Sequence, residues 1–461
     1  MQASFVVIGG GLSGLAAAIR LARYNENVLL LERHSRVGGL NSYYYRNNRL
    51  FETGLHAITN YADKAAKHAP LNKLLRQLKI SRDEIGFHQQ ISSEIRFPEA
   101  SLLFSNDFAE LRQQISDTFP SQSDNFQRLV SYIDEADPFS EQRYRSTRAV
   151  LTEFLDDRLL VEMLLCPVLY YGSSWENDID FKQYVIMFRS VFQEGLFRPA
   201  GTIKNLLDLL VAKLNHYGGT LKLGTGVRNI ISQGEKIIGV TLENGEKILC
   251  KHLVSTIGLD ETRLLLGRRK DPKGDRRLAF VESIFQLDRQ ALQTLPGDRT
   301  CIFYSRENDF RFEQPDVPVC YRSGVVSLPF NFQDLQTNRD SIEIRTTHLA
   351  NYQHWLTASK DSDLYEKMKE QHGRQACREV EPILGDFSDH IVFSDFFTPL
   401  TVERFTGKHG GAIYGSPKKV SDGSMGYDNL VLAGTDQGFL GIVGAMLSGV
   451  SMVNRHILSK L

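Results

Sequence analysis

The chain has 461 residues, of which 42% are hydrophobic and 24% charged, so the composition is that of a globular protein and not of a disordered one. Lys and Arg number 54 against 55 Asp and Glu, and a net charge of -1 argues against a basic nucleic-acid-binding protein. Five scattered cysteines without a C-x-x-C pair give no zinc or disulfide framework and indicate a reducing compartment. No apolar run approaches the roughly 18 residues that span a bilayer.

The N-terminus predicts one βαβ unit. We expect a short buried strand at 5–8, a tight glycine turn, a helix over 12–24 and a second buried strand at 28–31. The unit matters for function because its glycines have the spacing of a dinucleotide-binding turn.

That turn reads Gly9-x-Gly11-x-x-Gly14, and the acidic residue Glu32 ends the second strand. Gly9 makes the tight turn, Gly11 lets the backbone approach a pyrophosphate, and Gly14 lets helix and strand pack closely. The helix N-terminus offers free N–H groups to the phosphates. Glu32 accepts hydrogen bonds from ribose hydroxyls and disfavours a 2′-phosphate, so the pattern predicts FAD or NAD rather than NADP.

The rest of the chain alternates between mainly helical segments and segments of mixed helix and strand. Residues 62–190 look mainly helical, with one long amphipathic stretch at 149–165 before Pro167. Later elements are expected as helices at 202–216, 361–380 and 441–458, and as strands at 221–223, 237–241, 247–250, 252–256, 283–287, 325–328 and 341–347. Asn244-Gly245 is a hairpin turn signal.

Further motifs follow the fingerprint. Glu32-Arg33 and Gly38-Gly39 come directly after the second strand, and the segment 50–56 ends in Gly54-Leu55-His56. Pro199 to Thr202 opens a helix, Gly226-Val227 follows it, and Leu432-Ala433-Gly434-Thr435-Asp436 lies near the C-terminus. With these motifs the chain resembles the large FAD-dependent family of amine oxidases, phytoene desaturases, carotenoid isomerases and retinol saturases.

The resemblance implies an α/β fold with a discontinuous Rossmann-like FAD-binding domain, a mixed-sheet substrate domain and a helical insert. The expected boundaries are 1–80, 195–265 and 415–461 for the FAD-binding domain, 85–194 for the helical substrate or cap region, and 266–414 for the mixed α/β domain. FAD is the implied cofactor. The implied contacts are those of Gly9, Gly11, Gly14, Glu32, Arg33, Gly38, Gly39, Val227, Gly434, Asp436 and Gly444, with Val227 at the adenine and Asp436 at a ribitol hydroxyl.

The sequence contains no G-x-S-x-G or H-E-x-x-H pattern, which suits an enzyme whose cofactor carries the chemistry. His56 follows the second FAD element and is the candidate catalytic residue, as a proton donor or a substrate contact. The alternative is a histidine satisfied by hydrogen bonds in a packed loop. Arg404 and His409 are weaker candidates, and Tyr414 is either a cavity-lining or a core residue.

Two readings of the substrate follow from the resemblance. The first is a long hydrophobic polyene, carotenoid- or retinoid-like, changed by desaturation, saturation or cis–trans isomerisation. The apolar helical block would then form a tunnel mouth that rests on a membrane, although such a stripe is also typical of plain core. The second reading is an FAD-dependent amine oxidase, for which no aromatic pair is evident. A non-catalytic flavin-binding escort protein is the third alternative.

The expected location is the cytoplasm, with peripheral membrane contact. Ser459-Lys460-Leu461 matches a peroxisomal address, which has meaning only in a eukaryote, and it also suits the end of a helix.

Overall fold

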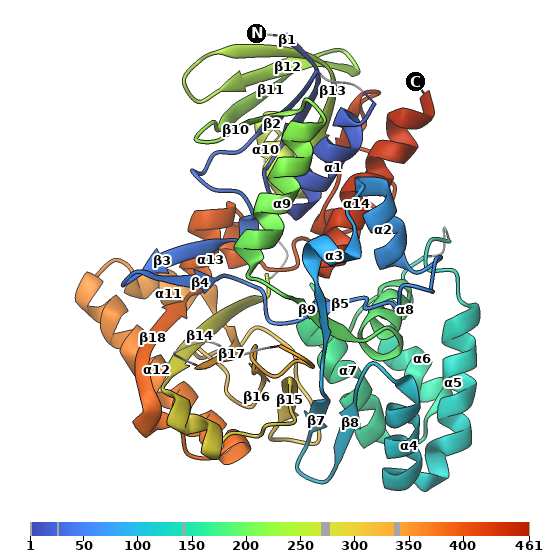
Figure 1. Ribbon diagram of the computed structural model, residues 1–461, viewed down its shortest axis with the longest axis vertical. Helices are drawn as coiled ribbons and strands as arrows, with labels where there is room; N and C mark the ends of the chain where they lie inside the picture. The colour runs from blue at the N-terminus through green and yellow to red at the C-terminus, as the bar shows by residue number, and fades with distance from the viewer. Residues whose placement is uncertain (1, 25–26, 141–142, 269–276, 336–341, 461) are drawn as a thin grey trace.

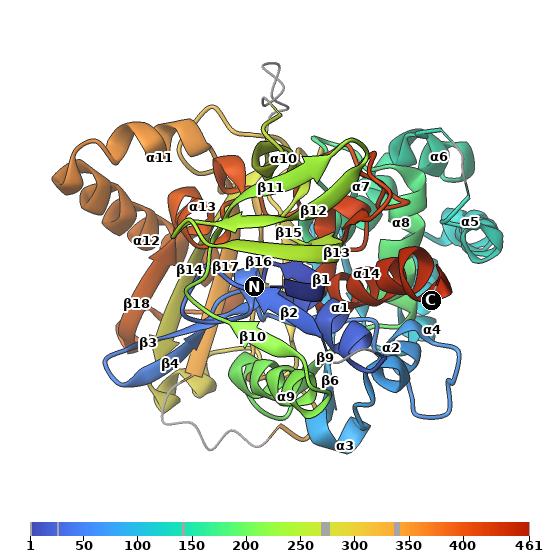
Figure 2. The same ribbon diagram turned by 90° about the horizontal axis from the view of Figure 1, so that it is seen from above.

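The computed structural model describes residues 2–24, 27–140, 143–268, 277–335 and 342–460. In Figure 1 one sheet lies at the top of the molecule, a second sheet at the lower left, and a block of helices at the lower right. The view from above in Figure 2 shows α14, near the C-terminus, lying beside α1 next to the first sheet.

The first sheet runs in the order β10-β2-β1-β13-β12-β11, and β19 pairs with the end of β13. Its strands are β1 (Gln2–Ile8), β2 (Val28–Leu31), β10 (Thr220–Lys222), β11 (Val227–Gln233), β12 (Lys236–Leu242), β13 (Lys247–Ser255) and β19 (Leu430–Leu432). The pairs β10–β2, β2–β1, β1–β13 and β13–β19 are parallel, whereas β11 and β12 form an antiparallel hairpin. The carboxyl ends of the parallel strands therefore meet at one edge.

Successive side chains of β1 explain how this sheet is covered. Phe5 and Val7 pack with the helices α1 (Leu12–Ala22), α2 (Pro70–Leu78), α9 (Ile203–His216) and α14 (Gly441–His456). Val6 and Ile8 point to the other face and pack with residues of the β11–β12 hairpin and α10 (Leu259–Leu265). A sheet buried on both faces reads as a continuous apolar run, as Phe5 to Ile8 does.

The second sheet has the order β18-β14-β17-β16-β15-β7-β8 and is antiparallel except between β15 and β7. Its strands are β7 (Ser93–Arg96), β8 (Ser101–Phe104), β14 (Ala279–Leu287), β15 (Cys301–Ser305), β16 (Ser323–Ser327), β17 (Ile342–Ala350) and β18 (Ile391–Phe397). Helices α11 (Tyr352–Ala358), α12 (Ser362–Leu384) and α13 (Pro399–Thr406) lie on the β18 side (Figure 1).

The helical block comprises α4 (Phe108–Thr118), α5 (Ser123–Glu135), α6 (Thr147–Phe154), α7 (Arg158–Gly172) and α8 (Phe181–Phe188). It shares one core with strands β7, β8 and β15 of the second sheet. Short pieces join the parts: α3 (Arg82–Ile85), the hairpin β3 (Tyr43–Arg46) and β4 (Arg49–Glu52), and the small sheet of β5 (Ile58–Thr59), β6 (Phe87–Gln89) and β9 (Leu196–Pro199).

Several expected elements differ from those observed. The single stretch expected at 149–165 is two helices, because the chain leaves α6 at Leu155 and Asp157 caps α7 by accepting a hydrogen bond from Leu160 N (3.1 Å). Pro167 lies inside α7 and does not end it, because dense packing of the surrounding helix offsets the lost hydrogen bond. Strand β11 was not expected, and 247–250 and 252–256 form one strand.

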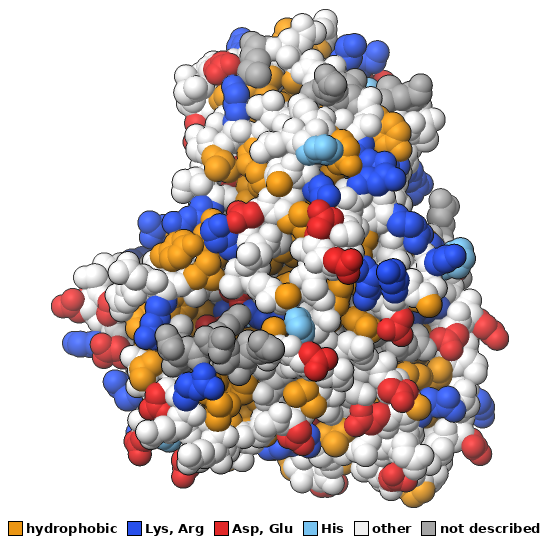
Figure 3. Space-filling model, viewed as in Figure 1, with side chains coloured by type: hydrophobic (Ala, Val, Ile, Leu, Met, Phe, Trp, Pro, Cys, Tyr) orange, Lys and Arg blue, Asp and Glu red, His pale blue; other side chains and the backbone are white. Residues whose placement is uncertain are grey.

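No helix within the described ranges is long and apolar enough to cross a bilayer. On the face shown in Figure 3, acidic and basic side chains are interspersed without a large field of one sign. Ser459 and Lys460 lie in a short 3₁₀ turn after α14, and Leu461 is outside the described residues.

Candidate active site

The glycine turn after β1 has the geometry that its spacing predicts. Gly9 has φ +100, which favours glycine, and a methyl on Gly14 would overlap the carbonyl oxygen of Gly9. Gly11 is different, since the nearest atom to an added Cβ is Gly38 O at 4.0 Å. The space in front of Gly11 is thus open, and no side chain caps the N–H groups of the first turn of α1.

Glu32 lies beside this turn at the end of β2. Its Oε2 accepts from Gly10 N (2.6 Å) and its Oε1 accepts from His34 N (2.8 Å). The backbone of residues 32–34 also accepts from Gly224 N and Thr225 N, which brings the segment leading to Val227 alongside. The structure therefore places the predicted ribose and adenine contacts next to each other.

A second glycine turn faces the first. Gly38 and Gly39 have φ +116 and +60, and Gly38 N donates to Gly10 O (2.9 Å). An added Cβ on Gly39 would lie 3.6 Å from Gly11 Cα, so the two turns approach closely without side chains between them. Arg33 points away from this gap, and its Nη2 donates to Arg404 O (3.1 Å) on α13.

The C-terminal motif forms the third part. Gly434 has φ +100, and its N–H donates to Ser448 Oγ (2.8 Å), which fixes the turn against α14. Gly441 begins α14 with φ +72, and an added Cβ would lie 3.3 Å from Thr59 Oγ1. Gly444 faces the same first turn, next to Phe439. Within the described part of the chain no side chain caps the first turn of α14, so its N–H groups can face an electron-rich ring.

Asp436 is buried and ties three segments together. Its carboxylate accepts from Leu259 N and Ser416 N (both 2.6 Å), and Lys408 Nζ lies 3.5 Å away. Burial by itself would raise the pKa of this carboxyl, but Lys408, Lys419 and the two N–H groups outweigh it and hold the pKa at about 2. A carboxylate has about four acceptor positions, so one remains for a hydroxyl donor.

These three parts fit an extended dinucleotide. The open positions at Gly11 and Gly39 would hold the pyrophosphate, Glu32 the ribose, Val227 the adenine, and Asp436 with Gly434 and Gly444 the ribitol and ring. Two uncapped helix ends supply the N–H groups that anionic and electron-rich groups need. Among the described residues no group of His, Cys, Asp and Glu is arranged to hold a metal ion.

His56 lies between the cofactor cradle and the second sheet. The loop that carries His56 packs against the segment that follows Gly39, because an added Cβ on Gly54 would lie 2.7 Å from Leu40 O. It also packs against the start of α14, because an added Cβ on Gly441 would lie 3.3 Å from Thr59 Oγ1. The ring Nδ1 is 3.0 Å from Ser327 Oγ, and Nε2 is 3.4 Å from Glu282 Oε2. Both ring nitrogens are engaged, so His56 touches protein on each side.

A network of buried charged residues supports this loop, and the sequence motifs do not predict it. The fully buried Arg198 pairs with Glu52, and its Nη1 donates to Leu55 O (3.1 Å). The fully buried Arg345 pairs with Glu282 (3.1 Å) and donates to Glu52 O (2.8 Å). The sequence signal for such a network is a charged residue within an otherwise apolar strand, as in Ile342-Glu343-Ile344-Arg345.

Burial alone would raise the pKa of the Glu52 carboxyl, but Arg198 and Arg345 reverse that effect and lower it. The pKa of Glu282 is likewise lowered, because His56 and Arg345 outweigh its desolvation. Both carboxylates therefore stay ionised, and the loop that carries His56 is held among charged residues of four strands, β4, β9, β14 and β17.

The other candidates divide into two groups. Tyr414 is partly exposed and donates to Tyr170 O (2.5 Å) at the end of α7, so it lies at the helical block. Lys419 Nζ donates to Tyr414 O (2.6 Å), and burial lowers the pKa of this lysine to about 8. Arg404 stacks on Phe405 and His409 contacts Glu403 (3.3 Å), so these two serve the α13 region instead.

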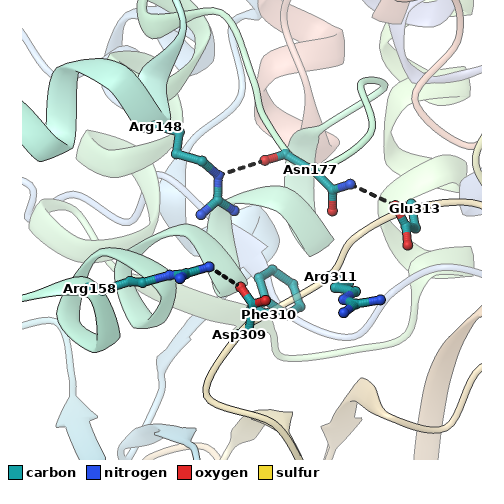
Figure 4. A pocket seen from close by; sticks show the side chains of 7 residues that line it. All are labelled: Arg148, Arg158, Asn177, Asp309, Phe310, Arg311 and Glu313. Carbon is teal, nitrogen blue, oxygen red and sulfur yellow. Dashed lines mark hydrogen bonds and ion pairs between the residues drawn. The ribbon is translucent and has the colours of Figure 1, made fainter.

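A separate surface pocket of about 330 Å³ is shown in Figure 4. It is lined by Arg148, Arg158, Asn177, Asp309, Phe310, Arg311 and Glu313, none of which belongs to the cradle. Arg158 pairs with Asp309 (2.6 Å) and Asn177 donates to Glu313 (2.8 Å), so its polar groups largely satisfy one another. A pocket of this polarity does not suit a long apolar ligand.

Comparison with known proteins agrees with the cradle. The sequence profile of the flavin-containing amine oxidoreductases matches residues 12–455, and the chain belongs to this family. It is similar to the chloroplastic prolycopene isomerase of Daucus carota, with 22% identity covering 98% of this chain and 79% of the relative. It is also similar to the 4,4'-diaponeurosporene oxygenase of Staphylococcus haemolyticus, with 22% identity covering 94% and 92%.

Solved structures show the same fold. An oxidoreductase from Methanosarcina mazei superimposes with a TM-score of 0.69 at 14% identity, covering 99% of this chain and all of that one. An engineered variant of putrescine oxidase gives a TM-score of 0.64 at 13% identity, covering 100% and 99%. The predicted α/β fold and the FAD cofactor are confirmed, and the protein is a flavin-containing oxidoreductase. The domain boundaries and the roles of single residues stay predictions.

Proposed function

We propose that this oxidoreductase acts on a long hydrophobic polyene, carotenoid- or retinoid-like, by desaturation, saturation or isomerisation. The observation that carries the proposal is the similarity, over at least 94% of the chain, to a prolycopene isomerase and a diaponeurosporene oxygenase. Both relatives are named for carotenoids, and they differ in reaction, so the substrate class is better supported than the reaction.

Partly exposed apolar side chains around the end of α7 and in neighbouring loops are consistent with an apolar substrate. Ala57, Tyr171, Ile413 and Tyr414 keep some exposed surface although they pack against the largest hydrophobic core. Such side chains offer apolar area to a ligand, and burial of that area stabilises a complex by about 25 cal/mol per Å². A long hydrocarbon therefore needs few polar contacts here.

In this proposal each part of the chain has one task. When bound, FAD would supply the hydride-transfer chemistry. The glycine turns and Glu32 hold its nucleotide half, and Asp436 orients its ribitol. The ion pairs of Arg198 and Arg345 fix the loop of His56, and His56 takes part in proton transfer at the site.

Spectroscopy of the purified holoprotein tests the substrate class. Polyenes supplied in liposomes are expected to change the flavin spectrum or to be converted under reducing anaerobic conditions, whereas putrescine and small monoamines should leave the oxidised flavin unchanged. Rapid reduction of the flavin by an amine, together with no response to any polyene, would establish the amine-oxidase alternative. Bound flavin that responds to neither a polyene nor an amine would favour the non-catalytic flavin-binding escort alternative.

Peripheral membrane contact is part of the same proposal, because such a substrate dissolves in lipid. Flotation of the holoprotein with liposomes measures it. Recovery of the protein in the lipid-free fraction at low and moderate salt would contradict membrane contact but not the substrate class.

A further inference from the structure

Tyr171 occupies the last turn of α7, close to the cofactor cradle. An added Cβ on its neighbour Gly172 would lie 3.1 Å from Leu440, the residue before α14 begins. The carbonyl of Tyr170 accepts the hydroxyl of Tyr414. The end of α7 therefore lies against the first turn of α14, which the His56 loop also contacts through Thr59 and Gly441.

A chain of polar atoms joins Tyr171 to His56. The Tyr171 hydroxyl is 3.4 Å from Cys301 Sγ, Cys301 Sγ is 3.8 Å from Ser327 Oγ, and Ser327 Oγ is 3.0 Å from His56 Nδ1. Cys301 and Ser327 are directly paired across strands β15 and β16, which explains their contact. Glu282 then accepts at His56 Nε2.

In this series of polar groups, only the residues at the two ends are partly exposed. Cys301 is 0% and Ser327 1% exposed, so neither meets a substrate. Tyr171 keeps exposed surface among the apolar side chains at the cradle, and the side chains of His56 and Glu282 are each 15% exposed. Both nitrogens of His56 are engaged, whereas the Tyr171 hydroxyl contacts Cys301 Sγ at 3.4 Å, and its O–H can rotate toward an apolar ligand.

We propose that Tyr171 gives a proton to the substrate and that Cys301, Ser327 and His56 form the relay that replaces it, an inference that rests on the polyene substrate proposed above. Glu282 is a positioning residue that keeps His56 aligned with Ser327. The relay assigns the protein to reactions in which carbon gains a proton, and therefore to saturation of a double bond.

One carbon of the double bond receives a hydride, and with it two electrons, from the reduced flavin. The neighbouring carbon forms a C–H bond as the Tyr171 O–H bond breaks. The thiol of Cys301, which at rest donates to Ser327 Oγ, then turns to reprotonate Tyr171. Ser327 turns its O–H to reprotonate Cys301, and His56 reprotonates Ser327 through Nδ1. Solvent at the exposed end restores the proton of His56.

The phenol and the thiol of the relay are both protonated before the reaction. Burial raises the pKa of the Tyr171 phenol far above its usual range, so the group keeps its proton at neutral pH. Burial likewise raises the pKa of the Cys301 thiol, which therefore has a proton to pass on.

The variant Tyr171→Phe tests the proposal, with Tyr184→Phe as the matched control, since the Tyr184 hydroxyl is buried on α8 without a hydrogen-bond partner among the described residues. The first measurement needs no turnover. The S–H infrared band of Cys301, assigned by its loss in Cys301→Ala, should shift in Tyr171→Phe and stay in place in Tyr184→Phe. An unshifted band in Tyr171→Phe would overturn the contact and the relay.

The second measurement is polyene reduction by the chemically reduced holoprotein in D₂O. The wild type should place one solvent deuterium in the product, and Tyr171→Phe should lower kcat by about 100- to 10,000-fold with little change in KM. Wild-type kcat in Tyr171→Phe would overturn the relay and leave the polyene function standing. If the wild type saturates no polyene, the relay is wrong. If it converts a polyene by isomerisation or desaturation instead, the proposed substrate class stands without the relay.

Discussion

Replacing Gly11 with Ala is expected to weaken FAD binding without unfolding the chain. Gly11 has φ -72 and ψ 178, an extended conformation that alanine adopts readily. The nearest atom to the new methyl is 4.0 Å away, so the folded chain accommodates it. Loss of glycine freedom in the unfolded state should even add about 0.4–1 kcal/mol to the free energy of unfolding of the apoprotein.

The same methyl projects into the gap between Gly11 and Gly39, where the pyrophosphate is expected. Extra methyl groups in a filled site cost about 1–3 kcal/mol, which corresponds to a loss of FAD affinity of about 5- to 150-fold. Gly14→Ala is the contrasting variant, because its methyl would overlap Gly9 O. It should lower the stability of the apoprotein itself by at least about 1–3 kcal/mol.

Two measurements separate these effects. Urea unfolding of the apoproteins gives the change in stability, and fluorescence titration with FAD gives the dissociation constant. Wild-type FAD affinity in Gly11→Ala would refute the assignment of this turn to the pyrophosphate. Wild-type stability in Gly14→Ala would refute the close contact between helix α1 and the turn.

Three further predictions concern stability and cofactor attachment. Arg198→Met leaves the buried Glu52 carboxylate without its ion pair and should lower the free energy of unfolding by about 3–5 kcal/mol in urea, so an unchanged midpoint would show that the pair contributes nothing. The pKa of Asp436 is about 2 when folded and 3.8 ordinarily, so its stabilising effect is complete above about pH 4 and is lost as the pH falls toward 2. Acid titration of Asp436→Asn should lack this component, and an acid limb identical to the wild type would contradict it. Boiling should release free FAD into the supernatant, whereas flavin that stays with the precipitate would indicate a covalent bond.

The sequence alone predicts the strand and turn geometry to which we assign the nucleotide half of the site. The strand at 5–8, the turn from Gly9 to Gly14 and the acidic end of the next strand at Glu32 are encoded within about thirty residues. Their conformations follow from local sterics: only glycine avoids the overlap at Gly14, and a doubly buried strand must be apolar throughout. The motif at Asp436 was readable for the same reason, since a strand, a glycine turn and a helix follow one another directly.

The tertiary structure decided what surrounds the reacting end. His56, Tyr171, Glu282, Cys301 and Ser327 are scattered over more than half of the chain and share no spacing. They meet because strand register pairs Cys301 with Ser327 and because the end of α7 and the His56 loop both pack on the start of α14. Register and packing depend on contacts between distant segments, whose free energy is realised only when the whole core forms, and a local pattern carries no record of them.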